Sequence, residues 1–367
     1  MKSISPVLSF LPLLLVCLAP SASGFTQIVN HPRFHPSSKL ATTKQSAWRK
    51  NQRSWTQPQQ RQQQSSQLQA FPVAPHVLTS VLPPFLGFYK SEYTVSLGYG
   101  FSVALTALAL LRQFSPSPIL SLHASALLFY GVRLNIFLVL RNRLSQRIQE
   151  FNTKVEERAK SRGNRMTRTP FILSCGMLYY GLVTPLWFTG KLLASSVAIP
   201  TWGVTVLKTL IAAQWLGYAA GAIGDLTKTY VKQSQKDEKY LVTSGIFSWI
   251  RHPNYSGEIL AWTANALTGL VAASLWISSS GVWPSVAAIA NLGLLALGWI
   301  GILFVLLRAT SNLEERQRNE YISQPKYQTW IENSWGGWQL PPKEAIDQAT
   351  PQIELEEDQE EESGSGI

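Results

Sequence analysis

Residues 245–258 read GIFSWIRHPNYSGE and lead directly into the mostly apolar run 259–278. Arg251 and His252 form a basic pair in this stretch. Pro253 follows them at a place where a helix would begin, because proline is favoured in the first helical turn. The apolar run has about the ~20 residues that a helix needs to cross a bilayer. The stretch therefore predicts a loop at a membrane surface that leads into a membrane-spanning helix.

A polar face is predicted on this helix. Four of its residues recur at intervals of three or four and so lie on one side: Asn254, Glu258, Trp262 and Asn265. A carboxylate at the head of a span normally faces the protein interior or a wet cavity, because contact with lipid is costly. Glu258 is therefore a candidate functional residue, and an interfacial carboxylate satisfied by water is the alternative.

The composition extends this prediction to the rest of the chain. Hydrophobic residues make up 46% and charged residues only 14%, whereas soluble domains carry about 25% charged residues. The apolar residues gather into six long runs: Thr94–Leu111, Ile119–Leu140, Phe171–Gly190, Val204–Gly224, Glu258–Ser278 and Val286–Leu307. A seventh span could lie in Val77–Tyr89, although Pro83 and Pro84 weaken it. We expect an all-α, polytopic transmembrane helix bundle of about six to seven spans.

The distribution of charge predicts the orientation of the spans. The net charge is +11. Because the basic residues flank apolar runs, the positive-inside rule explains them better than nucleic-acid binding does. Residues 141–168 carry nine Lys or Arg, and 228–251 and 308–326 are also basic, whereas the intervening loops carry none. With six spans, all basic segments share one membrane face. The two cysteines form neither a disulfide framework nor a metal-ligand spacing.

The two ends of the chain differ from the expected membrane domain, residues 76–342. Residues 1–24 resemble a signal peptide, and residues 25–75 are rich in Ser, Thr and Gln and contain no acid, as in a transit peptide. Together they predict delivery to a plastid membrane by a two-part presequence. The alternative is a secretory signal with a disordered polar segment, in the endoplasmic reticulum or another endomembrane. Residues 343–367 are expected to form an acidic, disordered tail.

The stretch Arg251-His-Pro-Asn-Tyr-x-Gly-Glu258 resembles a signature of membrane reductases related to steroid 5-alpha-reductase and of an uncharacterised family beside it. Three further elements fit this resemblance in order and spacing: Tyr130-x-x-Arg133-Leu134-x-x-x-Leu138-x-x-Arg141, Asp225-x-x-Lys228, and Leu313-Glu314-Glu315 followed by Tyr327-x-x-Trp330. The resemblance covers roughly residues 130–342. It implies an enzyme that uses NADPH to reduce a carbon–carbon double bond of a lipid, such as a sterol, an isoprenoid or an enoyl lipid, and no metal.

The same resemblance implies roles for particular residues. Asn254 and Glu258 would contact the nicotinamide half of NADPH. Further cofactor contacts would come from Asp225, Lys228, Tyr240, Arg251, His252, Tyr255 and Arg308. Tyr130 corresponds to a tyrosine that polarises the substrate carbonyl, with Glu92 as its supporting carboxylate; an interfacial aromatic and a span flank are the alternatives. His252 would bind phosphate or hydrogen-bond the loop backbone. Arg133, inside a span, needs a phosphate or an acidic partner.

Two departures from the pattern keep other functions open. Gly221 stands where uncharacterised relatives carry a glutamate, and Asn312 and Arg316 replace a His-rich element of the steroid reductases. These changes weaken the prediction of a steroid substrate. Isoprenylcysteine and phospholipid methyltransferases, which use S-adenosylmethionine, share a similar motif and are the enzymatic alternative. A non-catalytic membrane protein of the same fold is the third hypothesis.

Overall fold

The computed structural model describes residues 74–195, 197–280 and 284–340. The chain divides into two units, residues 1–71 and 72–367, and all the described residues belong to the second. The predicted signal peptide, nearly all of the transit-like segment and the acidic tail lie outside the described residues.

The described part of the chain is helical. Its six long helices are α5 (Leu97–Gln113), α6 (Pro118–Leu144), α8 (Thr169–Ala194), α9 (Thr201–Gln235), α10 (Pro253–Ser280) and α11 (Val286–Tyr321). Shorter elements are α4 (Pro75–Val81), η2 (Pro83–Phe88), η3 (Ser91–Tyr93), α7 (Gln146–Ser161), η4 (Arg165–Arg168), η5 (Gly245–Ser248) and α12 (Pro325–Asn333). Its one extended pairing is an isolated bridge between Ile250 and Trp335. The all-α prediction is confirmed.

Six helices in the described residues are long and apolar enough to cross a membrane, and each contains one of the six predicted apolar runs. The possible seventh span is absent from the described residues. There α4 ends at Val81, and Pro83 begins the 3-10 helix η2, so neither piece approaches the length of a span. Proline lacks the N–H that would continue the helix. The fold thus fits an integral membrane protein with six spans.

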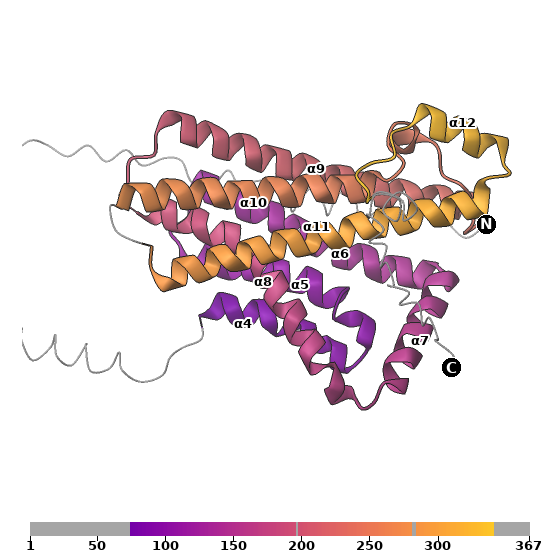
Figure 1. Ribbon diagram of the computed structural model, residues 1–367, viewed down its shortest axis with the longest axis horizontal. Helices are drawn as coiled ribbons and strands as arrows, with labels where there is room; N and C mark the ends of the chain where they lie inside the picture. The colour runs from indigo at the N-terminus through magenta and orange to yellow at the C-terminus, as the bar shows by residue number, and fades with distance from the viewer. Residues whose placement is uncertain (1–73, 196, 281–283, 341–367) are drawn as a thin grey trace, which may run out of the picture. The chain divides into compact units, whose positions relative to one another are not determined.

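Helix α10 lies at the centre of the bundle, where it packs against α8, α9 and α11 (Figure 1). Its contact with α9 depends on glycine. A Cβ atom on Gly257 would stand 2.5 Å from the Gly217 carbonyl oxygen, and one on Gly217 would stand 2.5 Å from that of Gly257. The two backbones therefore touch, as small residues allow between membrane helices. This contact holds the polar face of α10 against α9.

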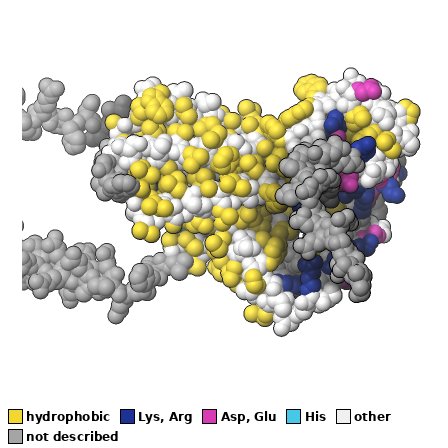
Figure 2. All heavy atoms as spheres, in the orientation of Figure 1, with side chains coloured by type: hydrophobic (Ala, Val, Ile, Leu, Met, Phe, Trp, Pro, Cys, Tyr) yellow, Lys and Arg dark blue, Asp and Glu magenta, His cyan; other side chains and the backbone are white. Residues whose placement is uncertain are grey.

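Hydrophobic side chains cover the long helices, and charged side chains gather toward one end (Figure 2). At that end lie α7 and α12 (Figure 1). Because α7 connects α6 to α8 and α12 follows α11, both belong to segments that the sequence predicts for the basic face. The two helices themselves were not expected, since each is too polar to be found as a span.

Candidate functional site

A buried ion cluster lies among three spans of the bundle. Arg133 of α6 is buried, and its Nη1 lies 2.7 Å from Oδ2 of Asp225 on α9. Its Nη2 lies 3.5 Å from Oε1 of Glu258 on α10. The expectation that Arg133 needs a partner is confirmed, and that partner is a pair of carboxylates. A charge inside a bundle is tolerated only when it is paired in this way.

Tyr130 lies one helical turn before Arg133 and joins the same cluster. Its hydroxyl lies 2.9 Å from Glu258 Oε2, to which it donates, and 3.0 Å from the Tyr99 hydroxyl. The ring is fully buried and stacks on Tyr218 at 4.5 Å, with Trp262 edge-on at 5.1 Å. Residues predicted for the reaction and for the cofactor therefore meet at one place inside the bundle.

Two polar atoms beside this cluster lack a partner in the described part of the chain. Gln214 Oε1 and Trp262 Nε1 are buried and form no hydrogen bond with any described residue. Leaving such a group unsatisfied costs about 1–3 kcal/mol. The Trp262 N–H needs an acceptor and Gln214 Oε1 needs a donor. The aromatic cluster around Tyr130 is therefore equipped to hold a polar group of a ligand.

Positive charges without carboxylate partners lie beyond the ion cluster. Lys228 follows Asp225 by one turn of α9, and the charges of Arg141, Lys232 and Arg316 all act on it. Neither Lys228, Arg141 nor Arg316 forms an ion pair with a described residue. Because both carboxylates of the cluster are committed to Arg133, the charge that remains available here is positive, which favours an anionic ligand.

Asn254 borders the ion cluster, and its side-chain amide forms no hydrogen bond with a described residue. The neighbouring Tyr255 is half-buried. The main chain of Asn254 lies against two glycines of α9. A Cβ atom on Gly221 would stand 3.4 Å from its carbonyl oxygen and 3.2 Å from Arg133 Nη2. A glutamate at position 221, which the resemblance implies for relatives, would therefore place its Cβ atom next to Arg133. In this chain Asp225 and Glu258 already supply two carboxylates there.

Arg251 and His252 bind the C-terminal part of the domain. Arg251 Nε lies 2.9 Å from Glu314 Oε1, and its Nη1 donates to the carbonyl oxygens of Ile331 and Ser334. His252 Nε2 lies 2.5 Å from Glu314 Oε2. Burial lowers the pKa of His252 although Glu314 opposes the shift. The ring Nε2–H donates this hydrogen bond, because a carboxylate can only accept. His252 thus contacts the carboxylate of the Leu313-Glu314-Glu315 motif rather than the loop backbone.

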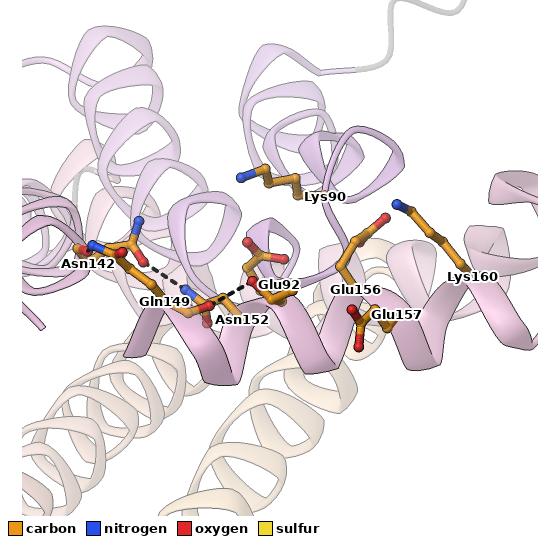
Figure 3. Close-up of a pocket in the computed structure, with 9 residues that line it drawn as sticks. Lys90, Glu92, Asn142, Gln149, Asn152, Glu156, Glu157 and Lys160 are labelled. Atoms are coloured by element: carbon orange, nitrogen blue, oxygen red, sulfur yellow. Dashed lines mark hydrogen bonds between the residues drawn. The ribbon is translucent and has the colours of Figure 1, made fainter. Parts of the chain in front are cut away.

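Three other predicted site residues lie elsewhere. Tyr240 accepts a hydrogen bond from Lys326 Nζ at 3.1 Å and packs against a separate cluster that includes Trp330. Arg308 is exposed and forms no ion pair with a described residue. Glu92 lines a polar pocket beside α7 (Figure 3), and no hydrogen bond joins it to Tyr130. The carboxylate that contacts Tyr130 is Glu258, on a helix far along the chain.

Fold and site together define a helical membrane protein of six spans with a buried network of an arginine, two carboxylates and a tyrosine. Residues 93–334, about two-thirds of the chain, match the family described as a protein of unknown function, DUF1295. The chain belongs to this family. No curated protein and no solved structure matches the chain. Among the described residues, no group of His, Cys, Asp or Glu could hold a metal ion.

Proposed function

We propose that this protein is a membrane-embedded reductase related to steroid 5-alpha-reductase, which uses NADPH to reduce a carbon–carbon double bond of a lipid. The observation that carries the proposal is the continuity of two features. The buried network of Arg133, Glu258 and Tyr130 adjoins the unpaired cations Lys228, Arg141 and Arg316. The buried network with Tyr130 suits a reacting carbonyl group, and the adjoining cations suit phosphate.

The residues at the site fit a dinucleotide. Guanidinium and ammonium groups are the usual partners of phosphate, and arginine donates two parallel hydrogen bonds to it. Lys228, Arg141 and Arg316 would hold the phosphates of NADPH. Asn254 has a free amide next to Glu258 and would bind the carboxamide of the nicotinamide. When bound, NADPH supplies the hydride that reduces the double bond.

The chain's own residues supply the proton and exclude water. In the proposed reaction the Tyr130 hydroxyl donates a hydrogen bond to the carbonyl conjugated with the double bond, and then passes its proton to the enolate that hydride addition produces. Glu258, 2.9 Å from that hydroxyl, accepts its hydrogen bond before substrate binds and so orients it; the proton that Tyr130 gives up is replaced from solvent after the product leaves. Arg133 holds Glu258 in position. The rings of Tyr218 and Trp262 cover Tyr130 and keep bulk water away.

The same charges argue against the methyltransferase alternative. S-adenosylmethionine carries a sulfonium and an ammonium, which would call for free carboxylates. Asp225 and Glu258 are both engaged with Arg133, whereas the groups without ion-pair partners are cations. The net field at this end of the site therefore favours a polyanion over a sulfonium compound.

Glu258→Gln tests the proposal, because it keeps the shape of the side chain and removes its charge. In the proposed complex Glu258, like Asn254, hydrogen-bonds the nicotinamide carboxamide. A hydrogen bond to a charged group is worth about 1.5–3 kcal/mol, so NADPH affinity measured by calorimetry should fall about 10- to 150-fold. Asn254→Ala should also weaken binding and disturbs no contact of Arg133. Glu332→Gln, an exposed glutamate on α12, is the matched control and should bind like the wild type.

S-adenosylmethionine is titrated alongside and should bind none of these proteins. A wild type that binds S-adenosylmethionine and ignores NADPH would replace the reductase with the methyltransferase. A wild type that binds neither would favour the non-catalytic alternative. Melting temperatures of all variants separate lost binding from lost folding.

For localisation, we propose that the protein is delivered to a plastid membrane. The proposal rests on the order of a signal-like segment, residues 1–24, and an acid-free transit-like segment, residues 25–75.

A further inference from the structure

A second polar site lies apart from the ion cluster, in the pocket beside α7 (Figure 3). The pocket has a volume of about 350 Å³ and lies between η3, the end of α6 and the polar side of α7. That volume is at the small end of the range for ligand sites. Its charged lining residues are Lys90, Glu92, Glu156, Glu157 and Lys160.

One wall of this pocket is firmly built. Glu156 Oε2 accepts a hydrogen bond from the Ser91 main-chain N–H at 2.8 Å, and Oε1 lies 3.1 Å from Nη2 of the buried Arg168. Arg168 Nη1 also donates to the Gly87 carbonyl oxygen. Burial acts to raise the pKa of Glu156, but the Ser91 N–H and Arg168 hold it below its ordinary value. Glu156 therefore ties α7 to the segment before α5, and its charge is balanced by Arg168.

The charges that remain in the pocket are two of each sign. Glu92 has a buried Oε2 that forms no hydrogen bond within the described part of the chain, and Glu157 forms no ion pair with a described residue. Lys90 and Lys160 also form no ion pair with a described residue, although Lys90 lies over the Tyr93 ring. A pocket with two free carboxylates and two free ammonium groups suits a ligand that carries both charges, because a simple cation or anion would leave two like charges unbalanced.

The pocket lies at the level where lipid head groups are found. Helix α7 connects the spans α6 and α8 and so follows the membrane surface at the charged end of the bundle (Figure 1). Phe151 on α7 is 60% exposed, and Leu144 and Met166 at its two ends are exposed as well. Apolar residues on a surface helix of this kind enter the interface between head groups and acyl chains. The polar side of the same helix lines the pocket.

We propose that this pocket binds the zwitterionic head group of a phospholipid from the surrounding bilayer, an aminoalkyl phosphate of the phosphatidylethanolamine type. The ammonium group would lie against Glu92 and Glu157, and the phosphate against Lys90 and Lys160. The amides of Gln149 and Asn152 each donate one hydrogen bond to Asn142, and each has a second N–H that could reach the glycerol oxygens. This site does not depend on the reductase proposal, since none of its residues contacts Tyr130 or Arg133.

The test is native mass spectrometry of protein released from bilayers of equal parts phosphatidylethanolamine and phosphatidylglycerol. The wild type should retain phosphatidylethanolamine about tenfold over phosphatidylglycerol, because the anionic lipid has no group for the two carboxylates. Glu92→Gln combined with Glu157→Gln should remove this preference and favour the anionic lipid. Glu150→Gln, on α7 but outside the pocket, is the matched control and should behave like the wild type.

A competition arm distinguishes a membrane lipid from a soluble metabolite. Excess glycerophosphoethanolamine in the buffer should leave the retained lipid in place, since the acyl chains hold it in the bilayer. Displacement of the lipid by this excess of the soluble compound, or a wild type that prefers phosphatidylglycerol as strongly as the double variant does, overturns the proposal. Equal melting temperatures of the three proteins exclude a folding defect.

Discussion

Arg133 is the residue on which the candidate site depends. It is buried inside a span, and its guanidinium is shared between Asp225 and Glu258. Because Glu258 also fixes the Tyr130 hydroxyl, one arginine connects the predicted catalytic tyrosine to the predicted cofactor residues. Removing a buried charge that balances two others leaves both of them uncompensated, which is more harmful than removing the whole cluster.

Arg133→Met should therefore destabilise the protein by about 3–5 kcal/mol, measured as the free energy of unfolding in bicelles. The triple variant Arg133→Met, Asp225→Asn, Glu258→Gln should recover much of that loss, because no unpaired charge is left in the bundle. An Arg133→Met protein as stable as the wild type would mean that the ion pairs are not formed in the membrane.

For single residues, the sequence predicted the polar face of α10 from helical spacing. It also predicted that Arg133 needs a partner, because an unpaired charge is difficult to bury inside a span. It could not predict that Arg251 and His252 contact Glu314, since that partner lies 62 residues beyond His252. It also suggested Glu92 for Tyr130 on the basis of distance along the chain. The tertiary structure brings Glu258 there, through the contact of α9 with α10.

Among the elements, α9 and α10 determine the shape of the site. They meet where Gly217 and Gly257 leave no room for a side chain. A larger residue there would force the helices apart and would move Glu258 away from Asp225 and Arg133. The glycines thus connect the packing of two spans with the geometry of the ion cluster.

Gly257→Ala should destabilise the protein by about 1–3 kcal/mol, since its Cβ would stand 2.5 Å from a carbonyl oxygen. Gly293→Ala on α11 is the matched control. Nothing lies within 4 Å of a Cβ atom there, so the gain in helix propensity should make it neutral or stabilising by up to about 1 kcal/mol. Unfolding of both variants in bicelles measures the difference, and equal effects would refute the close contact.

The spans themselves were predictable, because each is an apolar run of sufficient length. Their ends were not. Helices α9 and α11 have 35 and 36 residues, and at about 1.5 Å per residue they exceed the ~30 Å hydrocarbon layer. The polar continuation of α9 carries Lys228, and that of α11 carries Arg316. The sequence placed these residues in basic segments on one face, but a search for apolar runs stops before them, so only the structure shows that Lys228, Arg141 and Arg316 converge on one site.

Across the whole molecule, the arrangement implies that any polar ligand reaches the site from the basic face. The connection between α6 and α8, the connection between α9 and α10 and the segment after α11 all belong to that face when six spans alternate in direction. Positively charged segments are retained on the cytoplasmic side, or its equivalent, during insertion. The cations beside Lys228, which form no ion pair with a described residue, therefore face the compartment from which the proposed cofactor would come.

Single-cysteine labelling measures this orientation in a background that carries Cys17→Ser and Cys175→Ser. Ser161→Cys at the end of α7 and Ser323→Cys before α12 are both exposed and should react with a membrane-impermeant maleimide from the same side of sealed vesicles. Ser115→Cys, in the uncharged loop between α5 and α6, should react only from the other side. Residues 141–168 carry nine Lys or Arg and residues 113–118 carry none. The positive-inside rule therefore places positions 161 and 323 on the cytoplasmic side, or its equivalent, and position 115 on the opposite side, and labelling with these sides exchanged would violate the rule. If positions 161 and 323 were labelled from opposite sides, the number of spans between them would be odd. The basic segments would then not share one membrane face, and the proposed cofactor site requires that they do.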